Sequence, residues 1–123
     1  MEKVEEMLRG VFYIATVDGD QPRVRPFDSC VEYNGSIYFE TSNDKKVYRQ
    51  LLADPKIEIF AMGELGTLRL TGKVVLEDDL TAAKAVEDKI GKYLGDPRLA
   101  IFKISGATVV MTGSDGGVEN LSF

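Results

Sequence analysis

The sequence predicts a mainly β protein, a closed or partly open antiparallel barrel of about six strands with two or three flanking helices. Short runs rich in β-branched and aromatic residues are separated by the hairpin signals Asp18-Gly19 and Asn34-Gly35. Only three segments have the spacing of an amphipathic helix, and all three are short. A Rossmann dinucleotide fold is not expected, because the chain has no Gly-x-Gly-x-x-Gly turn and no regular alternation of strands and helices.

Hydrophobic periodicity assigns each element in turn. The expected strands cover residues 11–17, 23–33, 37–41, 56–62, 67–76 and 99–112. The expected helices cover residues 2–9, 44–53 and 80–94, and the last of them is expected to end at Gly95-Asp96-Pro97. The first strand is apolar on both faces, so we expect it to be buried.

Two strands contain an irregular position, and the chain ends in a polar tail. Pro26 is expected to interrupt the second strand, because proline donates no hydrogen bond to a neighbouring strand and belongs at an edge, a bulge or a gap that faces a ligand. Ser105-Gly106 is expected to break the last strand. The tail over residues 113–123 is rich in Gly, Ser and Asp, so we expect it to be mobile or to pack on a partner. Residues 1–123 are expected to form a single domain.

Composition excludes several classes of function. The 123 residues carry a net charge of −5 and include no histidine and a single cysteine. An acidic chain is a poor match for nucleic acid, and without histidine there is no Ser-His-Asp triad and no histidine-ligated metal or haem. Cys30 has no partner for an internal disulfide and is interpreted as a small core residue or, alternatively, as a reactive thiol. We expect a cytoplasmic protein, because no apolar run could cross a membrane and the acidic N-terminus is unlike a signal peptide.

The junction between the strand over 37–41 and the next helix has unusual chemistry. Ser42 or Asn43 would make a good N-cap for that helix. Lys45 and Lys46 would then lie in the first helical turn, where the positive end of the helix dipole disfavours cations. Hydroxyls, free backbone N–H groups and two ammonium groups at one place would suit a bound phosphate. The alternative is a solvated helix start that tolerates two lysines.

A second candidate region lies on the strand that begins at Arg23. In a regular strand, Arg23, Arg25 and Phe27 share one face. The two arginines either lie on a solvated surface or face an anionic or heteroaromatic ligand. No side chain in the sequence stands out as a general acid or base, so no catalytic residue is assigned, and no metal site is expected.

Three segments, Asp18 to Phe27, Ile37 to Lys46 and Leu52 to Ile59, follow one another in a recognisable order and spacing. Together they resemble the pyridoxamine 5′-phosphate oxidase-like, FMN-binding split-barrel family, and the resemblance extends over residues 5–112. It implies a Greek-key split barrel that forms a homodimer with two FMN sites at the subunit interface. Some relatives bind the deazaflavin F420 or haem instead.

The resemblance also implies which residues hold the cofactor. The matching positions are Arg23, Val24, Arg25 and Pro26 beside the flavin ring, and Thr41, Ser42, Lys45 and Lys46 beside the phosphate. Arg69 is expected to contact the cofactor of the partner subunit. The pyridoxamine phosphate oxidases themselves are longer and use an arginine–histidine pair near the C-terminus, so the lack of histidine argues against that substrate here.

The resulting hypothesis is an FMN-dependent oxidoreductase of unknown substrate. One alternative is a flavin-binding electron carrier or sensor that has the same site but no substrate of its own. Another is a relative that prefers F420 or another phosphorylated ligand, or that survives only as a dimeric scaffold.

Overall fold

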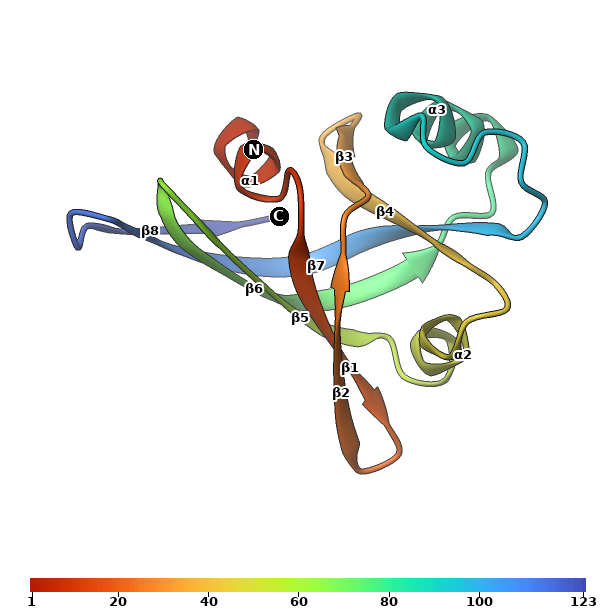
Figure 1. Ribbon diagram of the computed structural model, residues 1–123, viewed down its shortest axis with the longest axis horizontal. Helices are drawn as coiled ribbons and strands as arrows, with labels where there is room; N and C mark the ends of the chain where they lie inside the picture. The colour runs from red at the N-terminus through yellow and green to blue at the C-terminus, as the bar shows by residue number, and fades with distance from the viewer.

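The computed structural model describes all 123 residues and confirms the mainly β fold class (Figure 1). The elements in chain order are α1 (Glu2–Met7), β1 (Phe12–Asp18), β2 (Gln21–Phe27), β3 (Cys30–Tyr33), β4 (Ser36–Ser42), α2 (Lys46–Ala53), β5 (Lys56–Gly63), β6 (Gly66–Leu76), α3 (Leu80–Ile90), β7 (Leu99–Gly113) and β8 (Val118–Ser122). The strands form one open, eight-stranded sheet in the order β2-β1-β5-β6-β7-β4-β3, with β8 paired to β7. Every strand pair is antiparallel.

Both hairpin turns lie where the sequence places them. Gly19 has a φ of 64°, and the β1–β2 hairpin closes with Asp18 opposite Gln21. Asn34 and Gly35 have φ values of 53° and 85°, which is the left-handed pair that a type I′ turn needs. The strongest local signals in the sequence therefore fix the register of two hairpins.

The sheet has two more strands than the six that were expected. The expected strand over 23–33 is two strands, and it breaks at Asp28-Ser29 rather than at Pro26. Pro26 stays inside β2, opposite Tyr13, because β2 is an edge strand whose other side has no partner. The second additional strand is β8, which pairs with β7, so the tail over 113–123 is ordered within its own chain.

The last strand is bent rather than broken. Thr71 of β6 lies opposite Thr108 and Lys73 lies opposite Ser105, so β7 carries an extra residue at this point, a β-bulge. Gly106 occupies the bulge with a φ of 57°. The bend divides the outer edge of β7, whose first residues pair with β4 and whose last residues pair with β8.

Each of the three helices differs from expectation at one end, and α1 ends at Met7 rather than at residue 9. The α2 helix has Lys45 as its N-cap and no side-chain cap, so the expected cap at Ser42 or Asn43 is wrong. The reason is that β4 continues through Ser42, and the Asn43 amide donates to the Arg98 carbonyl at 2.7 Å. The α3 helix ends at Ile90 rather than at residue 94, because Gly91 takes a left-handed conformation with a φ of 72°.

The core lies inside the curve of the sheet and beneath α1 and α2. Phe39 stacks on Phe102 with ring centroids 5.6 Å apart, and Phe27 meets Phe39 edge to face at 5.4 Å. On the opposite face of β4, Tyr38 packs under α3 in a smaller cluster. The expectation that both faces of the first strand are buried is wrong for this chain, because Tyr13 on β1 is 45% exposed.

Cys30 at the start of β3 packs against this core. Burial raises the pKa of its thiol to about 12, and the Glu5 carboxylate adds to the shift. The thiol is therefore protonated near neutral pH, which favours the core interpretation over a reactive one. No helix of the chain is both long and apolar enough to cross a membrane.

Candidate functional site

A cavity of about 350 Å³ opens where β2 and β4 end, and it is the candidate site. Its walls come from the end of β2, the end of β4, the start of α2 and the connection between α3 and β7. The lining residues are Arg25, Pro26, Phe27, Asp28, Ser29, Glu40, Thr41, Ser42, Asp44, Lys45, Val47, Tyr93, Asp96, Arg98 and Leu99. Five of the eight residues predicted to bind a cofactor are therefore neighbours around one hollow.

Two polar side chains of β4 lack partners inside this cavity wall. Glu40 is only 5% exposed, and neither carboxyl oxygen has a hydrogen-bond partner. Ser42 lies two residues further along the same strand face, and its hydroxyl also has no partner. The Ser42 hydroxyl lies near the Asp44 carboxyl and is the main cause of its lowered pKa. The contact does not have the geometry of a full hydrogen bond, so the Ser42 hydroxyl still has no partner. Buried polar groups without partners are rare in folded proteins, so these two mark a place for a ligand or water.

Burial has a large effect on the protonation of Glu40. The pKa of its carboxyl rises from 4.5 to about 7, mainly because the site is desolvated. The Glu87 carboxylate on α3 and that of Asp28 raise the pKa further, while the Lys92 ammonium opposes them. Glu40 therefore changes its charge near neutral pH.

Like Arg25, Lys45 adds a positive charge to the cavity lining without a carboxylate partner. It is the N-cap of α2, its amide donates to the Ser42 carbonyl at 3.1 Å, and its side chain forms no ion pair. Lys45 and Val47, at the start of α2 where the backbone N–H groups have no side-chain cap, line the same cavity as Thr41 and Ser42. Such a combination of donors suits an anion.

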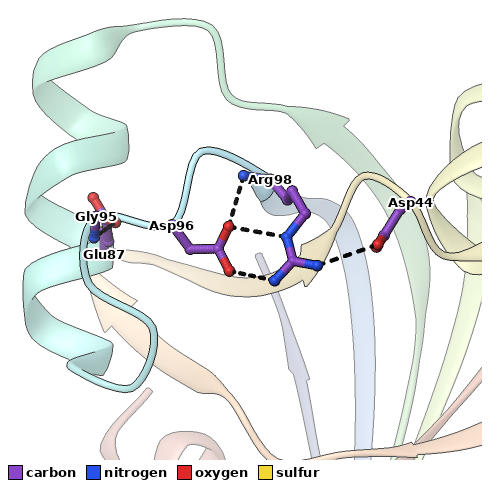
Figure 2. A network of polar contacts seen from close by, with 5 residues as sticks. All are labelled: Asp44, Glu87, Gly95, Asp96 and Arg98. Atoms are coloured by element: carbon purple, nitrogen blue, oxygen red, sulfur yellow. Dashed lines mark hydrogen bonds and ion pairs between the residues drawn. The ribbon is translucent and has the colours of Figure 1, made fainter.

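Arg98 lines the cavity, and Figure 2 shows its contacts with Asp96 and Asp44. Arg98 holds both carboxylate oxygens of Asp96, with Nε at 3.1 Å and Nη2 at 2.9 Å. Its Nη1 reaches Asp44 at 3.4 Å, so the α3–β7 connection is joined to the β4–α2 junction. Arg98 also lowers the pKa of Asp96 by hydrogen bonding. Gly95 donates its amide to Glu87 at 2.9 Å, which secures the same connection against α3.

The two predicted arginines of β2 are used within the chain. Arg25 donates to the Ile14 carbonyl at 3.2 Å, to Thr16 at 2.8 Å and to Gln50 of α2 at 2.6 Å. Burial lowers the pKa of its guanidinium, and the charge of Arg23 lowers it further. Arg23 lies outside the cavity and pairs with Asp18 at 3.2 Å. The guanidinium of Arg25 therefore shapes the cavity wall while its donors point to β1 and α2.

Three other predicted residues lie away from the cavity. Val24 is 69% exposed on the opposite face of β2. Lys46 lines a second, more open hollow of about 530 Å³ between α2 and the β1–β2 hairpin, together with Arg49. Arg69 on β6 pairs with Glu58 at 2.6 Å and lies 5.3 Å over the Phe60 ring. The structure thus brings Arg25, Pro26, Thr41, Ser42 and Lys45 together and leaves Arg23, Val24, Lys46 and Arg69 outside the cavity.

Sequence reasoning missed several residues of the site. Glu40 could have been identified from the sequence, because it is the one charged residue in the run Ile37-Tyr38-Phe39-Glu40-Thr41. Asp96 and Arg98 had none, because they belong to a connection that was expected to be a simple helix end. Their place beside Asp44 depends on the pairing of β4 with β7.

Comparison with known proteins supplies the family. The model of the pyridoxamine 5′-phosphate oxidase family matches residues 1–112, and the comparison with curated proteins gives no match. A NimC/NimA family protein from Clostridium acetobutylicum is 34% identical, with a TM-score of 0.88 over 100% of this chain and 92% of its own.

More distant structures share the fold. A pyridoxamine 5′-phosphate oxidase-related, FMN binding protein from Nostoc punctiforme is 12% identical, with a TM-score of 0.65 over 98% of this chain and 90% of its own. An F420 reductase is 17% identical, with a TM-score of 0.57 over 81% of this chain and 90% of its own. The family match over most of the chain, the 34% identical relative and the open antiparallel sheet agree. The chain belongs to the pyridoxamine 5′-phosphate oxidase-like, FMN-binding split-barrel family.

Proposed function

We propose that this protein binds FMN and acts as an FMN-dependent oxidoreductase. The observation that carries the proposal is the set of unpartnered groups in the cavity: the buried Ser42 hydroxyl, the Lys45 ammonium and the free N–H groups at the start of α2. Hydroxyl, ammonium and backbone donors form charge-assisted hydrogen bonds to a phosphate. Family membership supplies the flavin as the molecule that carries this phosphate.

The remaining residues of the cavity are compatible with an anionic ligand. Arg98 pairs with both Asp44 and Asp96, which leaves one net negative charge, and Asp28 pairs with Lys92 at 3.3 Å. The Lys45 ammonium, which lines the same cavity without an ion pair, balances that charge. The acidic residues around the rim therefore add little net repulsion. In this assignment Thr41, Ser42 and Lys45 would hold the phosphate, and Arg25 and Pro26 of β2 would lie beside the ring. Bound FMN would supply the electron transfer, while the chain supplies binding and orientation.

The proposal includes a homodimer with the cofactor sites at its interface. Apolar side chains on the side of the sheet that faces away from the core support this arrangement. This outer face comprises Tyr13, Val24, Met62 and Val75, which are 45%, 69%, 71% and 54% exposed. They come from four neighbouring strands, β2, β1, β5 and β6. A second copy on this face would cover apolar surface and would bring Val24 and Arg69 towards a shared site.

The decisive experiment is the visible absorption spectrum of the purified protein, followed by mass spectrometry of the released cofactor. We expect flavin absorption and the mass of FMN. A colourless protein that takes up no flavin when incubated with FMN would contradict the proposal, and preferential uptake of F420 would identify the other cofactor. Steady turnover with NAD(P)H and an electron acceptor would distinguish an enzyme from a simple electron carrier.

A further inference from the structure

We propose that Glu40 binds the ligand phosphate as a neutral acid that donates a hydrogen bond, so that phosphate binding takes up a proton from solution. The inference rests on the proposed function, which assigns the phosphate of FMN to this cavity. It adds a residue that the family resemblance did not single out, together with a pH dependence for cofactor binding.

The geometry of β4 is the first argument. Glu40 lines the cavity beside Thr41 and Ser42, yet both of its carboxyl oxygens are buried without a partner. The Ser42 hydroxyl, on the same strand face, is also buried and unpartnered. Two adjacent groups that both lack partners and both line one hollow indicate a ligand that contacts them together.

The charges around Glu40 are the second argument. Every other carboxylate of the cavity wall has a cationic partner: Asp28 has Lys92, and Asp44 and Asp96 have Arg98. Glu40 has none. A buried carboxylate without a counter-ion is strongly disfavoured, so it must gain either a cation or a proton.

The neighbouring elements favour the proton. Glu87 on α3 and Asp28 after β2 face Glu40 with negative charge, and Lys92 is the single opposing cation. Lys92 is already paired with Asp28. Ile101 of β7, the residue opposite Glu40 in the sheet, offers no charge. At the mouth of the cavity Lys45 is unpaired, while Asp44 and Asp96 share Arg98. Arg25 also lines the cavity, but its donors are used by Ile14, Thr16 and Gln50.

The sign of the proton exchange identifies the class of ligand. A phosphate dianion would repel a Glu40 carboxylate but would accept a hydrogen bond from the neutral acid, so its binding raises the proton affinity of Glu40. A cationic ligand, such as an amine, would stabilise the carboxylate and would release a proton. The unpaired Lys45 and the donors at the start of α2 favour the anion.

Isothermal titration of FMN at pH 8, in buffers with different enthalpies of ionisation, measures this exchange directly. The phosphate of FMN is a dianion at this pH, because its second pKa is about 6, so it contributes no proton of its own. We expect uptake of nearly one proton per FMN at pH 8 and of about half a proton at pH 7. Correspondingly, FMN affinity should fall by up to about tenfold per pH unit between pH 8 and pH 9.

Two variants and one ligand serve as controls. Glu40→Gln keeps the size and a hydrogen-bond donor but does not titrate, so it should bind FMN without proton uptake. Ser42→Ala should bind FMN more weakly while it keeps the uptake, because it removes a phosphate contact and leaves Glu40 intact. Riboflavin, which lacks the phosphate, should bind the wild-type protein without proton uptake.

The outcomes separate this inference from the proposed function. Failure of the wild-type protein to bind FMN would overturn the proposed function and this inference with it. FMN binding without proton uptake, with proton release, or with an uptake that persists in Glu40→Gln would overturn only the inference. Equal uptake with riboflavin would place Glu40 beside the flavin ring and would refute its contact with the phosphate.

Discussion

Arg25 joins three elements through one guanidinium group. It donates to the Ile14 carbonyl and the Thr16 hydroxyl of β1 and to the Gln50 amide oxygen of α2, and Thr16 also donates to Gln50 at 2.6 Å. An edge strand has hydrogen bonds to the sheet on one side only, so these side-chain bonds add to the attachment of β2. The network fixes the wall of the candidate site before any ligand binds.

Replacing this guanidinium should destabilise the protein. Arg25→Met keeps an apolar stem but leaves the polar atoms of Thr16 and Gln50 without one donor, so we expect the free energy of unfolding to fall by about 1–3 kcal/mol. Urea denaturation measures the change. Arg23→Met is the matched control, because it removes an exposed ion pair to Asp18 and should change stability by less than about 1 kcal/mol. Equal effects of the two substitutions would contradict the structural role of Arg25.

Glu40 should make the stability of the cofactor-free protein depend on pH. Its folded-state pKa of about 7 lies above its usual value of 4.5, so the unfolded chain loses this proton first as pH rises. The neutral Glu40 carboxyl makes its full contribution to the free energy of unfolding below pH 4.5, and this contribution is lost as pH rises through 7. Glu40→Gln retains that stability because it does not titrate. We therefore expect the free energy of unfolding of the variant to increase relative to that of the wild type by about 2–3 kcal/mol as the pH rises from 4.5 to above 8.

Urea denaturation of both proteins across this pH range tests the linkage. Glu64→Gln, in the exposed β5–β6 turn, is the control for loss of a negative charge, and its difference from the wild type should stay nearly constant with pH. A constant difference for Glu40→Gln as well would show that Glu40 is ionised in the folded protein.

Lys45 and Lys46 are neighbours in sequence but face different hollows. Lys45→Ala should weaken FMN binding by about 1–3 kcal/mol, the cost of losing a charge-assisted hydrogen bond. Lys46→Ala removes the same charge one residue away and should have a clearly smaller effect. Fluorescence titration of FMN measures both affinities. Equal losses would mean that only the general positive charge of the α2 start matters, and unchanged affinity in Lys45→Ala would place the phosphate elsewhere.

At the scale of the element, the β6–β7 bulge depends on a glycine. A Cβ atom on Gly72 would lie 3.2 Å from the Ala107 Cα and 3.2 Å from the Ser105 carbonyl oxygen, both of them backbone atoms. The two strands would have to move apart, so we expect Gly72→Ala to lower the free energy of unfolding by about 1–3 kcal/mol. Gly63→Ala, at a β5 end with nothing within 4 Å, is the control and should be nearly neutral. Urea denaturation distinguishes the two.

Elements governed by short-range chemistry could be predicted from the sequence. Asn34-Gly35 specifies its turn because few other residue pairs tolerate two left-handed conformations. The ends of α2 and α3 could not be predicted as well, because competing signals lie close together. Gly91 ends α3 although apolar residues continue to Leu94, and Ser42 is retained by β4 although it would make a good N-cap.

At the scale of the whole molecule, the candidate site is assembled from segments that lie far apart in the sequence. Asp44 and Arg98 meet across 54 positions because β4 pairs with β7, and this pairing has no local signal. Thr41, Ser42 and Lys45 could be proposed early because strand, turn and helix start are contiguous. Glu40 acquires its unusual protonation from burial and from the charges of Glu87 and Asp28, which lie far from it in the sequence, so no local pattern shows it.

The outer face leads to a prediction about assembly. Tyr13 lies near its centre, between Pro26 on β2 and Phe60 on β5. Tyr13→Glu would place a charge inside the proposed interface, where desolvation without a partner is costly, so we expect the dimer to dissociate. Analytical ultracentrifugation should show twice the chain mass for the wild type and the chain mass for the variant.

The matched control for this substitution is Leu80→Glu, at the start of α3. Leu80 is 85% exposed but does not belong to the outer face, so the variant should remain dimeric. Because the cofactor sites are proposed to lie at the interface, Tyr13→Glu should also lose bound flavin, whereas Leu80→Glu should keep it. A wild-type protein that sediments as a monomer at every concentration while it retains FMN would show that one chain completes the site, and the apolar outer face would then need another partner.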